Sequence, residues 1–198
     1  MKKILYISSL FLLFASARMD AQTNTSLTYS MGFATGDLAD FISKASFRGA
    51  TLDFRKMARP DLGVGFSLGW NTFYEEKPYD TYTYESQSLS GKQYRYSNHV
   101  PMLISFDYYM KPGEKISPFV GLGTGVTYTR RNTDMNLYTL EQDAWNFSLQ
   151  PQIGVQLNNS LTSGTTIMLK YYYGLKAGDL PEPQSYLALN VGFVFRQP

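Results

Sequence analysis

Apolar and polar residues alternate along the stretch from Trp145 to Leu157, which reads WNFSLQPQIGVQL. Its odd-numbered positions are bulky or apolar, and its even-numbered positions are small or polar. A period of two held over these thirteen residues predicts a β-strand with two unlike faces. A tilted strand that crosses a bilayer needs roughly 9–11 residues, and most strands of globular proteins are shorter than this one. The open question is which solvent each face meets.

The same alternation recurs in seven other segments, separated by connections that are short and long in turn. The predicted strands cover 27–34, 50–55, 62–71, 100–108, 120–128, 145–157, 166–175 and 187–195. Short connections are 58–61, 111–117 and 158–164, and longer ones are 36–44, 75–93, 130–143 and 176–184. This rhythm predicts an all-β fold, an eight-stranded antiparallel up-and-down transmembrane β-barrel with its long loops outside the cell. Within 75–93, Tyr82 and Tyr84 alternate with threonines, so that connection is expected to extend its strands as a hairpin.

The two faces of the predicted strands differ in charge and in size. The bulky rows contain no Asp, Glu, Lys or Arg, whereas the other rows carry glycines, small polar residues and several charges. A soluble eight-stranded barrel, such as a lipocalin, would turn the bulky face inward around a ligand. The interior of eight strands is narrow and suits the glycine-rich rows. We therefore expect the bulky face to meet lipid.

Aromatic residues make up 16% of the chain, and they gather at the ends of the predicted strands. Those near the long connections are Trp70, Tyr128, Trp145 and Tyr173, and those near the short connections are Tyr108, Phe54 and Phe195. Two aromatic girdles with an aliphatic band between them are typical of the two membrane interfaces.

Four charged residues fall on the inward rows: Asp53, Arg55, Asp107 and Lys170. In a narrow lumen such charges need partners, and two of each sign are present. They predict a polar network that fills the lumen; a gated ion path is the alternative.

The N-terminus has the features of a secretory signal peptide. Lys2 and Lys3 precede an apolar stretch over 4–17, and a cut after Ala21 would leave a barrel domain of residues 22–198. An N-terminal membrane anchor is the alternative, but the apolar stretch is short for one. The chain has no cysteine, which excludes a lipoprotein and disulfides. We expect export through the Sec pathway to the outer membrane of a Gram-negative cell.

Cleavage after residue 21 would remove three of the 18 basic residues and one of the 16 acidic residues. The mature chain would then carry equal numbers of both, and no basic run remains. The composition therefore gives no indication of nucleic acid binding.

Two segments resemble a known family. Asn98-His-Val-Pro-Met-Leu-Ile, followed by Asp107-Tyr-Tyr-Met, resembles the fourth strand of small Bacteroidota outer-membrane β-barrel proteins, and 116–126 resembles their glycine-rich fifth strand. The resemblance implies an OmpA/OmpX-type eight-stranded barrel without a peptidoglycan-binding domain. It also implies insertion by the barrel-assembly machinery, although Arg196-Gln-Pro follow Phe195 in place of a terminal aromatic. Such a resemblance specifies architecture better than function.

Little in the sequence indicates catalysis. His99 is the only histidine, and its neighbours Ser97 and Asn98 form no recognisable catalytic motif. We therefore expect no enzyme, with a lipid A-modifying barrel as the alternative. Scattered carboxylates and one histidine predict no metal site and no cofactor.

The long connection 75–93 carries the most suggestive surface residues. Tyr79, Tyr82 and Tyr84 can bury area on a partner at low entropic cost. We therefore expect a structural or interaction barrel in contact with outer-membrane lipid, free-standing or as an accessory subunit of a larger outer-membrane complex. The alternative is a small-solute channel.

Overall fold

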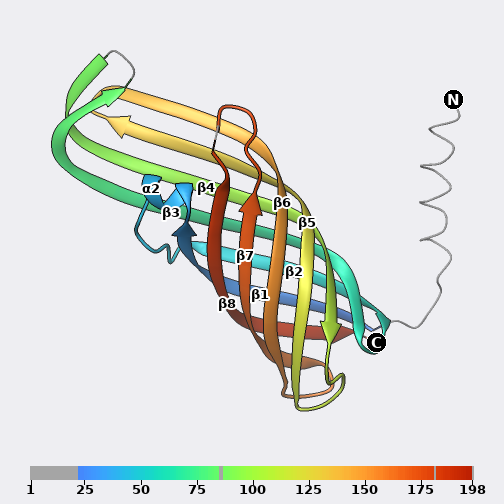
Figure 1. Cartoon of the computed structure of the whole chain (residues 1–198). Coiled ribbons are helices and arrows are strands. Elements are labelled where there is room, and N and C mark those ends of the chain that lie inside the picture. Colours follow the sequence, from blue (N-terminus) through green and yellow to red (C-terminus); the bar gives the residue numbers. More distant parts are fainter. Residues whose placement is uncertain (1–21, 85–86, 181, 198) are drawn as a thin grey trace, which may run out of the picture.

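The computed structural model describes residues 22–84, 87–180 and 182–197, and it forms a single closed β-barrel (Figure 1). The predicted signal peptide, residues 1–21, lies outside the described residues. The elements in chain order are β1 (Thr23–Thr35), α2 (Asp37–Phe41), β2 (Gly49–Arg59), β3 (Leu62–Tyr84), β4 (Gln87–Tyr109), β5 (Ile116–Met135), β6 (Tyr138–Asn158), β7 (Ser163–Gly174) and β8 (Gln184–Gln197). Within the described residues, no helix has the length and apolar character needed to cross a membrane.

The strands pair in sequence order, each antiparallel to the next, and β1 pairs with β8 to close the ring. The β1–β8 register runs from Thr23↔Gln197 to Thr35↔Ser185. Closure satisfies the main-chain groups that an open sheet would leave at its edges. The predicted eight-stranded antiparallel up-and-down barrel is therefore confirmed.

All eight strands are longer than expected, and β3, β4, β5 and β6 exceed their predicted ranges most. The hairpin of β3 and β4 covers most of 75–93, as the alternation of Tyr82 and Tyr84 indicated, and each strand has 23 residues. The expectation of a loop over 130–143 was wrong, because β5 continues to Met135 and β6 begins at Tyr138. Pairing runs up to Met135↔Tyr138, so these residues find their main-chain partners in each other.

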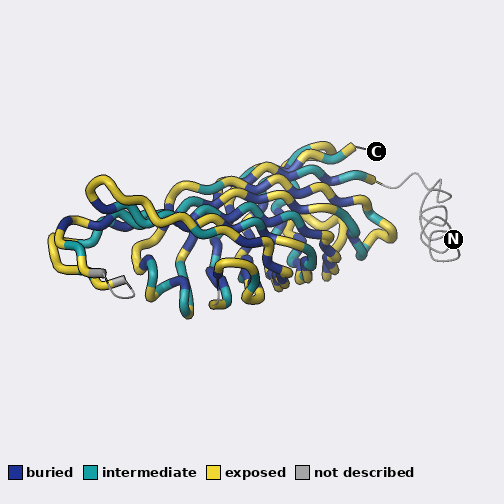
Figure 2. Tube along the Cα trace, turned by 90° about the horizontal axis from the view of Figure 1, so that it is seen from above, coloured by how far each residue is buried: buried dark blue, intermediate teal, exposed yellow. Residues whose placement is uncertain are grey.

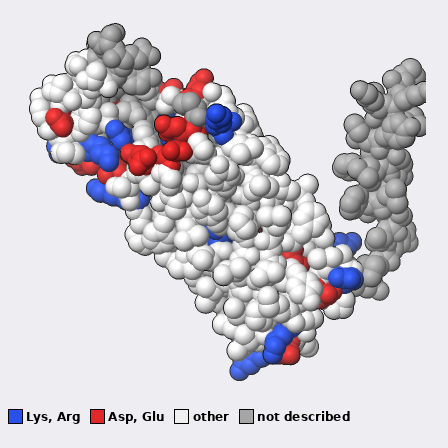
Figure 3. All heavy atoms as spheres, in the orientation of Figure 1, with Lys and Arg blue, Asp and Glu red and all other residues white. Residues whose placement is uncertain are grey.

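Burial alternates along every strand (Figure 2). The glycine-rich and polar rows face the lumen, and the bulky rows face outward, with Leu27, Phe66 and Ile104 all exposed. Charged residues gather toward the two ends of the barrel in the face shown in Figure 3, and the wall between them is almost bare of charge. We call the end with the turns 60–61, 110–115 and 159–162 the short-turn end, and the other the long-loop end.

Candidate functional site

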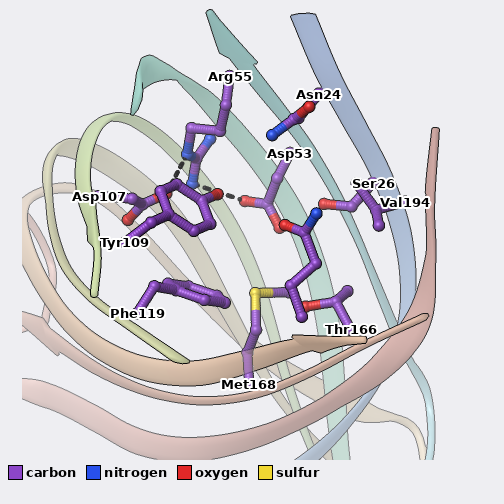
Figure 4. A pocket seen from close by; sticks show the side chains of 11 residues that line it. Asn24, Ser26, Asp53, Arg55, Asp107, Tyr109, Phe119, Thr166, Met168 and Val194 are labelled. Atoms are coloured by element: carbon purple, nitrogen blue, oxygen red, sulfur yellow. Dashed lines mark hydrogen bonds and ion pairs between the residues drawn. The ribbon is translucent and has the colours of Figure 1, made fainter. Parts of the chain in front are cut away.

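The four charged residues predicted for the lumen meet there in one cluster. Lys170 Nζ lies 2.9 and 2.8 Å from the two carboxylate oxygens of Asp53, and Ser67 Oγ donates to the same carboxylate at 2.6 Å. Arg55 bridges the two acids: its Nη2 lies 3.2 Å from Asp53 Oδ1, and its Nε donates to Asp107 (Figure 4). Two positive and two negative charges thus cancel inside the barrel.

The Arg55 side chain lies along the barrel wall. Its Nη1 donates to the carbonyl oxygens of Phe54 and Phe66, at 3.1 and 2.9 Å. Gly65 faces Arg55 across the β2–β3 ladder, and a Cβ there would collide with the Phe54 carbonyl oxygen. Gly65 therefore allows the main chains of β2 and β3 to approach closely beside Arg55. The guanidinium satisfies its charge and its hydrogen-bonding needs together.

Below the charge cluster, toward the short-turn end, the lumen is nearly filled. Tyr109 packs on Phe119 with ring centroids 5.1 Å apart, and Met168 lies beside them (Figure 4). The cavity that remains between these rings and the charges has a volume of about 20 Å³. That is room for about one water molecule and no continuous path.

Above the charge cluster, the lumen is closed by the connection between β1 and β2. We call this connection, which inserts Leu38 and Ile42 among aromatic rings of the strands, the plug. Tyr172 stacks on Tyr186 at 4.5 Å, and Phe73 meets the edge of Tyr186 at 5.4 Å. Leu38 and Ile42, from the connection between β1 and β2, insert into this group, and neither exposes any surface. Sequence reasoning treated 36–44 as an ordinary loop; the signal available was apolar spacing at positions 38, 41 and 42.

Phe41 packs against the outer side of this apolar cluster, and two arginines contact its ring. The guanidinium carbons of Arg131 and Arg95 lie 4.6 and 5.1 Å from its ring centroid, within the range of cation–π contacts. Arg95 also donates to the Phe41 carbonyl oxygen at 2.9 Å. The plug is thus attached to β4 and β5 as well as packed into the lumen.

Glu75 of β3 attaches the plug a second time. Its carboxylate accepts from the Ser43 amide at 2.6 Å, from Ser43 Oγ at 3.1 Å and from Lys77 Nζ at 2.9 Å. Burial alone would raise the pKa of Glu75, but the hydrogen bonds from Lys77 and Ser43 outweigh it and lower the pKa below its usual value of 4.5. The ionised carboxylate is therefore the form that holds the plug.

The attachment is expected to weaken in acid. Because the folded-state pKa is lowered, the stabilisation is complete above pH 4.5 and is lost as the pH falls through the lowered value. A fluorophore on Ala45→Cys, the only cysteine of that variant, should gain mobility only as the pH is lowered below 4.5. Glu75→Gln should abolish this response. Glu76→Gln, which breaks the exposed Lys92 pair, should keep it; an unchanged response in Glu75→Gln would contradict the assignment.

Four strands continue beyond the closed ring as an extension of the same sheet, which we call the blade. It consists of residues 72–84, 87–98, 130–135 and 138–143 of β3, β4, β5 and β6. The ring pairing of β2 with β3 ends at Gly49↔Asn71, and that of β6 with β7 ends at Ser148↔Gly174. In Figure 1 the blade leans away from the ring axis.

The blade carries a groove of about 610 Å³, the blade groove. Its lining is largely apolar and aromatic, with amide and hydroxyl groups between the rings: Tyr82, Ser88, Leu89, Gln93, Thr133, Met135, Tyr138, Thr139 and Leu140. A volume of 300–1,000 Å³, roughly, is usual for small-ligand sites. The lining contains no charged side chain.

The structure divides the three predicted contact tyrosines. Tyr82 lines the blade groove, and its hydroxyl donates to the Pro78 carbonyl oxygen at 2.6 Å. Tyr79 is exposed but lies outside the lining, and the side chain of Tyr84 lies outside the described part of the chain. Met135, Tyr138 and Leu140 were missed, because their segment was expected to be a loop.

The outward aromatic residues of the predicted girdles lie toward the two ends of the barrel. Tyr128 pairs with Trp145 across β5 and β6, and their ring centroids lie 5.1 Å apart. Trp70, Trp145 and Tyr173 are exposed toward the long-loop end, and Tyr108 is exposed at the short-turn end. Their use as membrane anchors belongs to the proposal below.

His99 is buried in the upper lumen. Its Nε2 lies 2.9 Å from Ser97 Oγ, its Nδ1 lies 3.3 Å from Thr129 Oγ1, and its ring meets Phe73 edge-on. Neither His99 nor Ser97 exposes any surface. Among the described residues, no group of three or more His, Asp or Glu side chains is arranged to hold a metal ion.

Comparison with known proteins identifies the class of fold. No protein-family model matches the sequence, and no curated protein matches it. Neisserial surface protein A is 15% identical, with a TM-score of 0.55 over 88% of this chain and 96% of that one. Ail, the attachment invasion locus protein of Yersinia pestis, solved with the heparin analogue sucrose octasulfate, is 16% identical, with a TM-score of 0.54 over 90% of this chain and 100% of that one.

The outer membrane protease OmpT of Escherichia coli is also similar, at 6% identity and a TM-score of 0.51 over 90% of this chain and 97% of that one. At such identities the likeness concerns the fold alone. The chain thus has the fold of outer-membrane β-barrels, which non-enzymes and a protease share. The finer resemblance to Bacteroidota proteins stays a prediction.

Proposed function

We propose that the protein is a non-conducting interaction barrel of the outer membrane, which displays the blade outside the cell to bind a partner. The observation that carries the proposal is that four strands leave the ring together and form a groove of about 610 Å³ above a filled lumen. The bulky outward rows meet lipid, and the aromatic girdles lie at its two interfaces.

The state of the lumen supports the non-conducting part of the proposal. The charge cluster, the rings below it and the plug above it occupy successive levels, and a cavity of about 20 Å³ is left beside the charges. An eight-stranded barrel has little interior space beyond that of its own side chains. A small-solute channel would require both the plug and the charge cluster to move.

The chemistry of the blade groove indicates the kind of partner surface. Its neutral, partly aromatic lining suits an uncharged surface with apolar side chains. Four basic residues around it are paired with acids: Lys77 with Glu75, Lys92 with Glu76, Arg130 with Glu141 and Arg131 with Glu182. A fifth, Arg95, donates to Gln93 and to the Phe41 carbonyl oxygen and packs on the Phe41 ring. We therefore propose a protein partner rather than a polyanion of the kind bound to Ail.

An enzymatic role has less support. Ser97 and His99 are hydrogen-bonded, but both are fully buried, and a substrate could not reach them without unfolding the plug. The partners of the histidine are hydroxyl groups, so no carboxylate orients it as in a catalytic triad.

Export and assembly follow the expected route in this proposal. β1 begins at Thr23, directly after the predicted cut, and the outward Phe193 and Phe195 supply the aromatic pattern that the barrel-assembly machinery would recognise. Sec-dependent export and cleavage at residue 21 complete the route. In the membrane the barrel would serve as an accessory subunit of a larger complex, joined through the blade.

Site-specific photocrosslinking in native cells tests the partner. A benzoylphenylalanine replacing Leu89, which lines the blade groove, should give one discrete adduct, and adding Leu140→Glu should remove it. The matched control is the same probe at Ser90, whose side chain hydrogen-bonds Thr81 at 2.8 Å outside the groove. Equal adducts at both positions, or none at Leu89, would count against the proposal.

A further inference from the structure

The outer wall of the barrel carries a second groove, the wall groove, at the β1–β4 side. Its volume is about 470 Å³, and its lining consists of Leu27, Ala50, Thr51, Leu52, Leu68, Gly69, Trp70 and Val100. Thr51 has a buried side chain, and the outward residues of the set are all apolar. The hollow arises because Ala50, between Tyr29 and Trp70 in the sheet, is small among bulky outward neighbours.

A cation lies at the long-loop end of this groove. The Arg48 carbonyl oxygen accepts from the Thr72 amide at 2.9 Å, so the β2 ladder continues to Arg48 in register. Arg48, Ala50 and Leu52 therefore follow one another along the outward face at intervals of about 7 Å. Trp70, at the predicted interface, lies opposite Ala50.

The Arg48 guanidinium is available for a ligand. It is exposed, and it lies 5.8 Å from the ring centroid of Tyr74, which holds it at the wall. In the described part of the chain no carboxylate forms an ion pair with it, and the nearby Glu76 is paired with Lys92 at 2.7 Å. Arg48 thus places a positive charge at the long-loop end of an apolar groove. This arrangement is complementary to a molecule with an anionic head and an apolar tail.

We propose that the wall groove and Arg48 form a binding site for one phosphate-bearing lipid of the outer leaflet. The acyl chain lies in the groove over Ala50, and the phosphate accepts hydrogen bonds from the Arg48 guanidinium, whose planar fork matches phosphate oxygens. A purely apolar protein surface would fit the groove but would leave the cation without a partner. The site needs the membrane location proposed above but not the partner of the blade groove.

Native mass spectrometry of the purified full-length mature barrel tests the site, with phosphatidylglycerol and diacylglycerol of equal chains as probes, because diacylglycerol has the same apolar tails and no phosphate. The wild type should retain phosphatidylglycerol in preference, and Arg48→Gln should weaken that lipid alone by roughly tenfold, the usual worth of a charge-assisted hydrogen bond. Ala50→Phe, which fills the groove, should weaken both lipids. Arg48→Lys should recover part of the preference.

Two matched controls separate site binding from general lipid contact. Arg59→Gln removes an exposed arginine at the short-turn end, and Thr165→Phe adds a ring on β7, across the ring from β3. Both should bind lipid as the wild type does, and all variants should keep a heat-dependent gel mobility. Equal retention of the two lipids by the wild type, or no change in Arg48→Gln, would overturn the site, whatever the crosslinking at Leu89 gives.

Discussion

Asp53→Asn is expected to lower the free energy of unfolding by about 3–5 kcal/mol, because it leaves buried charges without their partner. Asp53 accepts from Lys170 at 2.8 and 2.9 Å and pairs with Arg55 at 3.2 Å, and all three side chains are at most 4% exposed. After the substitution, one remaining carboxylate, Asp107, faces two buried cations. Urea unfolding of the barrel in liposomes, followed by fluorescence of Trp70 and Trp145, measures the loss.

A double variant distinguishes loss of a partner from loss of packing. Asp53→Asn with Lys170→Met removes one charge of each sign, and it should recover a large part of the stability, since a neutral pair avoids the burial of an unpaired cation. Asp61→Asn is the matched control, because its exposed pair with Arg59 at 3.2 Å is worth about 1 kcal/mol or less. Equal losses in Asp53→Asn and Asp61→Asn would show that the cluster contributes no more than a surface ion pair.

Leu38→Asp is expected to release the plug while the barrel stays closed. Leu38 is fully buried among Phe73, Tyr172 and Tyr186, and an ionised carboxylate in such surroundings costs several kcal/mol, about 3 or more. The strands do not depend on the plug for their pairing, so the cost falls on a local opening. Trypsin should then cut after Lys44 about a hundredfold faster, since roughly 1.4 kcal/mol corresponds to a factor of ten.

Mass analysis of the fragments identifies the cut, and heat-dependent gel mobility reports on the barrel. Ala45→Asp is the control, because it adds the same charge at an exposed position of the same connection. It should leave the cleavage rate near that of the wild type. If Leu38→Asp abolished the mobility shift, the plug would be part of the barrel core rather than a separable closure.

The proposed functions use different faces of the same fold. The blade groove lies beyond the ring and has a neutral lining, whereas the wall groove lies on the outward face and ends at Arg48. Between them the lumen holds the charge cluster and the plug, which fill the interior of the ring. The lumen and the wall groove have different chemistry because each strand has two faces: one face lines the interior, and the other faces the surroundings of the barrel.

The candidate site was predictable from sequence in part. The four lumen charges were identified because each interrupts an inward row of small or polar residues, and Tyr82 was found because it alternates with threonines. Met135, Tyr138 and Leu140 were not found, since their segment is rich in polar and charged residues and its alternation is short. Leu38 and Ile42 were overlooked because the helix that carries the apolar spacing has only five residues, too few to establish a period.

The stretch from Trp145 to Leu157 and its seven counterparts determined the strand number and the two unlike faces, because a side-chain period of two separates two environments wherever a strand lies between them. The alternating lengths of the connections indicated the antiparallel order, and the small residues of the inward rows indicated which face turns outward. Only the tertiary structure decided which charges pair, how far the strands run and what closes the lumen. Asp53 and Lys170 are 117 residues apart, and they meet because the ring brings β2 and β7 across one narrow interior. Such contacts depend on register and closure, which are properties of the whole sheet and of no single segment.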